Sequence, residues 1–108
     1  MDYLPYTVTT DTGDKFNIEF PLSPHTEDRV RIHQLLTTIM NALASDLKVL
    51  GETSNGDILQ AVSMALAIRA RMVHAPEPTM RGIVGDLTSS ALQACFDADR
   101  NSEPAGHG

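Results

Sequence analysis

The sequence predicts a mainly α-helical α+β fold, in which an N-terminal β-hairpin is followed by three α-helices. Apolar and polar residues alternate on both sides of an Asp/Gly-rich turn in the first 22 residues, which is typical of a hairpin. Two later stretches carry apolar residues at spacings of three and four, which is typical of amphipathic helices. Between them lies a stretch that is apolar nearly throughout. This pattern predicts that the second helix is central and largely buried.

The chain has 108 residues and a mass of 11.7 kDa, which is the size of one compact domain. We expect a single domain over residues 1–100 and a disordered tail over 101–108, because the tail is polar and contains glycine and proline. An apolar content of 42% is enough to form a core, so the bulk of the chain is not expected to be disordered. The single cysteine excludes an internal disulfide framework.

The hairpin is predicted over residues 3–22, with its turn at residues 11–14, Asp-Thr-Gly-Asp. An isolated hairpin is marginally stable in water. Its apolar face must therefore pack on the helices or on another chain. The residues expected on that inward face are Tyr6, Val8, Phe16, Ile18 and Phe20.

The first helix is expected to begin with Ser23 as N-cap and Pro24 at the first helical position. It is expected to end at Gly51, which acts as a left-handed cap. The apolar stripe consists of residues spaced by three or four, namely Ile32, Leu36, Ile39, Leu43, Leu47 and Leu50.

The second helix is expected to begin after Ser54, with Asp57 three residues further on as in a capping box. Twelve of the sixteen residues from Ile58 to Val73 are apolar, which favours burial on more than one side. The other two helices of so short a chain cover only part of such a surface. We therefore expect a two-fold homodimer, the commonest soluble oligomer, to cover the rest.

The third helix is expected from Thr79 to Asp99, after a proline-containing connection over residues 74–78. Cys95 has apolar neighbours along this helix and no adjacent base, so we interpret it as a buried structural thiol rather than a nucleophile. The expected apolar stripe comprises Met80, Val84, Leu87, Ala91, and Ala94 or Cys95.

No catalytic or metal-binding motif is recognisable, so we expect neither an enzyme nor a bound cofactor or metal. No two histidines lie three or four residues apart, so no helix offers a His-x-x-x-His metal edge. The chain also lacks a glycine-rich phosphate loop and the Gly-x-Ser-x-Gly turn of a serine nucleophile.

Four basic residues lie close to the connection between the second and third helices: Arg69, Arg71, His74 and Arg81. Cations at the end of a helix compensate its dipole, which is one interpretation of this cluster. The alternative is a small docking site for an acidic partner or ligand. Asp46, beside the apolar stripe of the first helix, is expected to form a structural ion pair with Arg69.

The charge balance excludes some classes of partner. Eight lysines and arginines stand against fourteen acidic residues, and the net charge of −6 with no basic run excludes general attraction to nucleic acid. No uncharged window is long enough to span a membrane. The first residues lack the basic region and apolar core of a signal peptide, so a cytoplasmic location is expected.

Two functions are compatible with these observations. The first is a small acidic protein-interaction module, an adaptor, regulator or accessory subunit, that is not catalytic and acts as a homo-oligomer. It binds itself and, in the adaptor form, another protein. The alternative is a small-ligand-binding protein or enzyme whose pocket lies between helices or at a dimer seam. Its candidate polar groups are His25, Asp28, His33 and His74.

Overall fold

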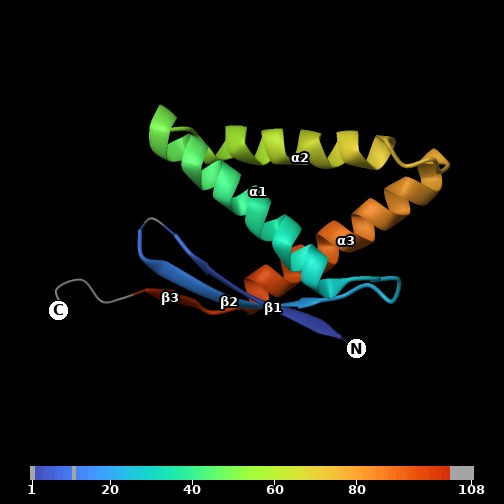
Figure 1. The fold of residues 1–108 in the computed structure, drawn as a ribbon, viewed down its shortest axis with the longest axis horizontal. Helices are drawn as coiled ribbons and strands as arrows, with labels where there is room; N and C mark the ends of the chain where they lie inside the picture. Colours follow the sequence, from blue (N-terminus) through green and yellow to red (C-terminus); the bar gives the residue numbers. More distant parts are fainter. Residues whose placement is uncertain (1, 11, 103–108) are drawn as a thin grey trace. The chain divides into compact units, whose positions relative to one another are not determined.

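The computed structural model describes the backbone of residues 2–10 and 12–102, and the side chains of these residues up to 99. It confirms the predicted fold class, a hairpin followed by three helices (Figure 1). The elements in chain order are β1 (Tyr3–Thr9), β2 (Asp14–Pro21), α1 (Arg29–Leu50), α2 (Asn55–Arg71), α3 (Glu77–Asp97) and β3 (Arg100–Ser102).

The chain divides into two compact units. Unit 1 comprises Met1–His33 and Gly85–Gly108, and it contains the sheet, the start of α1 and most of α3. Unit 2 comprises Gln34–Val84, and it contains the rest of α1, all of α2 and the start of α3. The buried apolar side chains of the described residues, Leu4, Ile18 and Ala94, all belong to unit 1.

The sheet is antiparallel, with the strand order β1-β2-β3. Leu4 and Ile18 are each only 6% exposed, and exposed residues alternate with more buried ones along both strands of the hairpin. Gly13 in the turn has a φ of 88°, a conformation that favours glycine. The predicted inward face is confirmed, because its residues are buried or half-buried and the residues between them are exposed. Leu4, which pairs with Phe20, also belongs to this face.

The third strand was not predicted. Residues 101 and 102 belong to β3, which pairs with β2 over Asp14–Phe16, where the sequence predicts a disordered tail. Three residues are too few to produce a visible alternation, and the pairing is supplied by the open edge of β2. The rest of the predicted tail, residues 103–108, lies outside the described residues.

The first helix begins at Arg29 rather than at Ser23 and Pro24. The Ser23 carbonyl accepts a hydrogen bond from the Thr26 N–H at 3.0 Å, which closes a turn instead of a helix. Asp28 provides the N-cap, because its Oδ1 accepts from the Arg31 N–H at 3.0 Å. The predicted end is confirmed by Gly51, which has a φ of 84°.

The predicted start of the second helix is confirmed. Ser54 has an extended conformation, and its Oγ accepts a hydrogen bond from the Asp57 N–H at 3.1 Å. The predicted burial of this helix is not found, since α2 has no buried residue in the single chain. Apolar composition indicates that a surface needs cover, but it does not indicate that the same chain provides it.

Replacing Ser54 with alanine is expected to lower the free energy of unfolding by about 1 kcal/mol, because the Asp57 N–H loses its acceptor. Urea denaturation followed by circular dichroism measures this change. Ser63→Ala is the matched control, since the Ser63 hydroxyl only donates to the Gln60 carbonyl within the helix. Equal destabilisation by both substitutions would show that the cap is not important.

The third helix begins and ends two residues earlier than predicted, at Glu77 and Asp97. Pro78 lies in its first turn, where the missing N–H would have no helical partner in any case. The Met80 N–H donates to the Pro76 carbonyl at 3.1 Å, which closes this first turn. A proline near the predicted start is therefore part of the helix rather than its boundary.

Candidate functional site

Two of the four predicted docking residues, Arg71 and Arg81, line one cavity in unit 2. This cavity has a volume of about 640 Å³ and lies at the connection between α2 and α3. Arg69 and His74 are not among its lining residues. The remaining walls are mostly apolar and consist of Ala67, Ala70, Val73, Ala75, Glu77, Met80 and Val84.

The charge of this cluster is partly compensated. Arg81 Nε lies 2.7 Å from Glu77 Oε2, and the two side chains are 78% and 75% exposed. An ion pair this exposed contributes little to stability. Arg69 Nη1 donates to Met72 Sδ at 3.1 Å, and the described residues contain no ion pair between Arg69 and Asp46. The predicted Asp46–Arg69 pair is therefore wrong.

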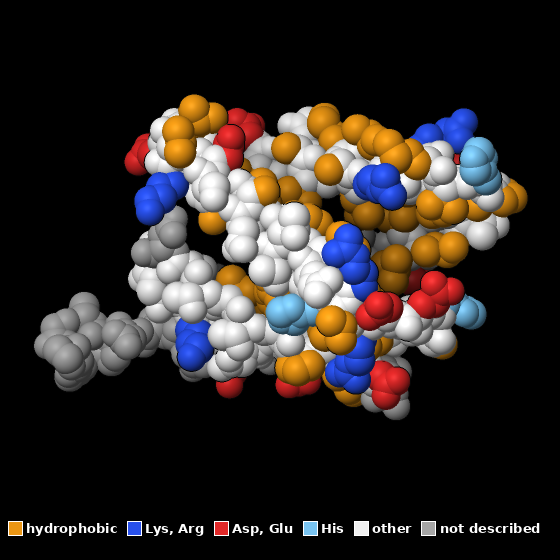
Figure 2. All heavy atoms as spheres, in the orientation of Figure 1, with side chains coloured by type: hydrophobic (Ala, Val, Ile, Leu, Met, Phe, Trp, Pro, Cys, Tyr) orange, Lys and Arg blue, Asp and Glu red, His pale blue; other side chains and the backbone are white. Residues whose placement is uncertain are grey.

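The exposed surface of α2 is apolar on two sides. Leu59, Val62 and Leu66 are spaced by three and four residues, so they lie on one face of the helix. Met64, Ile68 and Met72 are spaced by four and lie on another face. Leu59 is 70% exposed and Ile68 is 58% exposed. Figure 2 shows hydrophobic side chains along the length of α2.

The parts of α1 and α3 within unit 2 also carry exposed apolar side chains, among them Leu35, Ile39 and Ile83. In unit 1, Leu92 and Phe96 of α3 are exposed as well. These exposed apolar side chains include no acid, base or nucleophile. The chemistry that they support is the burial of apolar surface against another polypeptide.

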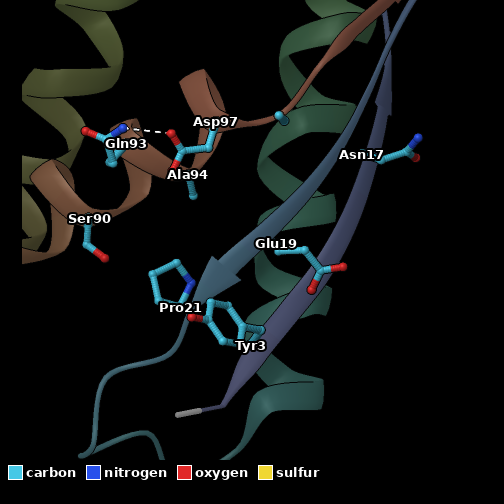
Figure 3. Close-up of a pocket in the computed structure, with 9 residues that line it drawn as sticks. Tyr3, Asn17, Glu19, Pro21, Ser90, Gln93, Ala94 and Asp97 are labelled. Atoms are coloured by element: carbon cyan, nitrogen blue, oxygen red, sulfur yellow. Dashed lines mark hydrogen bonds between the residues drawn. The ribbon is translucent and has the colours of Figure 1, made fainter.

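A second cavity lies in unit 1, between the C-terminal part of α3 and β2 (Figure 3). Its volume is about 470 Å³. Gln93 Nε2 donates to Asp97 Oδ1 at 2.9 Å on the helix wall. The lining residues come from the hairpin, with Tyr3, Asn17, Glu19 and Pro21, and from α3 and the residue after it, with Ser90, Gln93, Ala94, Asp97 and Ala98.

The polar groups proposed for a ligand pocket are absent from the walls of the cavities. His33 packs edge-on against the Tyr6 ring, with a centroid distance of 5.0 Å. None of His25, Asp28, His33 and His74 lines either cavity, or a third one of about 440 Å³ beside the start of α1. The part of the chain that the structure describes contains no group of three or more potential metal ligands.

Cys95 is a free, half-buried thiol in α3. Its burial raises the pKa of the thiol above the ordinary value, because desolvation disfavours the thiolate. A raised pKa lowers the thiolate fraction at neutral pH, so this environment does not activate the sulfur as a nucleophile. The interpretation of Cys95 as a structural residue rests on this physical argument.

Sequence reasoning missed the cavity beside β2. Its lining residues lie far apart along the chain, and none of them belongs to a motif. The alternation of apolar and polar residues in the hairpin indicated on which face of the sheet each side chain lies. Nothing in the sequence indicated that α3 returns to β2. The residues of the unit 2 cavity were partly foreseen, because they are close in sequence.

Among the described residues, no helix has both the length and the apolar character that crossing a bilayer requires. Comparison with models of protein families, with curated proteins and with solved structures found no match to this chain.

Proposed function

We propose that this protein is a non-catalytic protein-interaction module that acts as a homo-oligomer, in its simplest form a two-fold dimer. The interaction surface consists of the apolar faces of the helices in unit 2. The observation that carries the proposal is the pair of exposed apolar faces on α2, a helix with no buried residue in the single chain.

The angular positions on α2 support this proposal. At 100° per residue, the face containing Leu59 and Leu66 points roughly 150° away from the face containing Met64 and Ile68. One neighbouring helix covers only one face, so α2 needs contacts on both sides. The polar residues Gln60, Ser63 and Arg71 occupy the sector that is left for solvent.

The amount of exposed surface is also consistent with a partner. Within unit 2, the large apolar side chains of Val49, Leu50 and Leu59 are 81%, 73% and 70% exposed. Side chains this apolar are typical of obligate interfaces, which are more hydrophobic than transient ones. A second copy is the partner we favour, because closed two-fold dimers are the commonest soluble oligomers and other copies of the chain are present wherever it is made.

Light scattering after size exclusion tests the proposal directly. At micromolar concentration, the expected mass is twice that of the 11.7 kDa chain, and it should persist on tenfold dilution if the interface is large. A mass of 11.7 kDa throughout the concentration series would contradict the homo-oligomer. The same series performed with a mixture of tagged and untagged chains distinguishes a dimer from a larger assembly.

A further inference from the structure

We propose that the cavity between β2 and α3 binds an extended, positively charged peptide segment, which adds to the free edge of β2 as a further strand. This inference goes beyond the proposed function. It concerns unit 1 and not the apolar helix faces of unit 2, so either proposal can fail without the other.

The first argument is the unpaired edge of β2. β3 pairs only with Asp14–Phe16, whereas β2 continues to Pro21. On that side, the described residues provide no strand for the stretch Asn17–Pro21. A row of backbone groups without a neighbouring strand is a template for pairing with another chain.

The second argument is the direction of the backbone groups. The Leu22 N–H donates to the Asp2 carbonyl, and the Thr10 N–H donates to the Asp14 carbonyl, both at 2.8 Å. The even-numbered residues of β2 therefore form the hydrogen-bonded pairs with β1. Because these pairs alternate in an antiparallel ladder, the N–H and C=O of Glu19 point away from β1, toward the open edge.

The third argument is the size and wall of the cavity. The stretch from Asn17 to Pro21 is about 13 Å long at the rise of a strand, so it pairs with a short extended segment. The opposite wall is formed by α3 and the residue after it, where Ala94 and Ala98 have small side chains that let a peptide backbone approach. Figure 3 shows Ala94 and Asp97 on the helix and Pro21 and Tyr3 across from them.

The charge of the lining selects the peptide. Glu19 and Asp97 contribute two carboxylates, and the described lining residues include no lysine or arginine. Gln93 donates a hydrogen bond to Asp97 and so restrains that carboxylate on the helix wall. The ring of Tyr3, which is 47% exposed, offers an additional surface for a cationic side chain. An arginine- or lysine-containing segment is therefore the complementary occupant.

The test uses the full chain labelled with ¹⁵N and the blocked pentapeptide acetyl-Thr-Val-Arg-Val-Thr-amide. Its counterparts carry glutamate in place of arginine, or N-methyl groups on the backbone nitrogens of the third and fifth residues. In an antiparallel strand with the arginine opposite Glu19, these are the nitrogens that face β2. We expect the arginine peptide to shift the amide resonances of Glu19 and Ala94 and to bind about tenfold more tightly than the glutamate peptide. N-methylation should abolish these shifts, because it removes the backbone donors of the added strand.

Charge reversal supplies the control. Glu19→Lys should invert the preference between the two peptides. Glu19→Gln is the milder variant and should weaken the preference for the arginine peptide. Glu52→Lys is the matched control, since Glu52 is exposed in the connection between α1 and α2 and should leave the preference unchanged.

Three results would overturn the proposal. The first is equal binding of the arginine and glutamate peptides, and the second is binding that tolerates N-methylation. The third is a change of the assembled mass in Glu19→Lys with Glu52→Lys unaffected, since the cavity would then hold a second copy of the chain rather than a foreign peptide.

Discussion

In the proposed homodimer, replacing Leu66 with aspartate is expected to dissociate the assembly into a species of 11.7 kDa. Leu66 is 38% exposed in the single chain and shares a face of α2 with Leu59 and Val62. When a second copy covers this face, the new carboxylate is buried without a partner. An uncompensated buried charge costs about 3–5 kcal/mol, and a symmetric dimer contains it twice.

Light scattering and circular dichroism together measure this effect. The matched control is Gln60→Asp, which introduces the same side chain into the same helix but on its polar side, near Ser63. The control should keep the mass of the wild-type protein. If Leu66→Asp also keeps that mass and melts cooperatively, the face containing Leu59 and Leu66 is not an interface.

The parts of the fold that sequence predicted correctly depend on local signals. Alternation on both sides of the turn at Gly13 specifies which residues of the hairpin face inward, because the side-chain period of a strand is two. Ser54 and Gly51 mark helix ends, since each acts on backbone groups within four residues of itself. Signals of this range are readable without knowing the rest of the structure.

The start of α1 was mispredicted because two capping residues compete over a short distance. Ser23 and Pro24 satisfy the pattern of a helix start, and so does Asp28, which the structure selects. Arg29, the first residue of the helix, donates from Nη2 to the Tyr3 carbonyl at 2.6 Å. This contact joins residues 26 positions apart, and no local pattern contains such information.

The candidate sites were predictable only where sequence proximity decides them. Arg71 and Arg81 share a cavity because they flank one connection, but Arg69 is rotated by roughly 200° from Arg71 and contacts Met72 instead. The cavity beside β2 depends on α3 returning to the hairpin, which is a tertiary event. Likewise, the composition of α2 predicts that its apolar surface packs against other residues. It does not specify whether those residues belong to the same chain or to another one.

Replacing Ile18 with alanine is expected to lower the free energy of unfolding by about 2–5 kcal/mol. Ile18 is 6% exposed and lies opposite Tyr6 in the hairpin, so the substitution removes buried methyl groups and leaves a cavity. Lys15→Ala is the control, because Lys15 is an exposed residue of the same strand and its loss should change stability by less than about 0.5 kcal/mol.

Urea denaturation at two protein concentrations gives this prediction a second readout. Ile18 is buried within one chain, so the stability lost on substitution should not depend on the concentration of the protein. In the proposed dimer, Leu66→Asp acts through assembly, and its effect should diminish where the wild-type protein is itself dissociated. A loss for Ile18→Ala that varies with concentration, or that does not exceed the loss for Lys15→Ala, would mean that the hairpin packs against a partner rather than within its own chain.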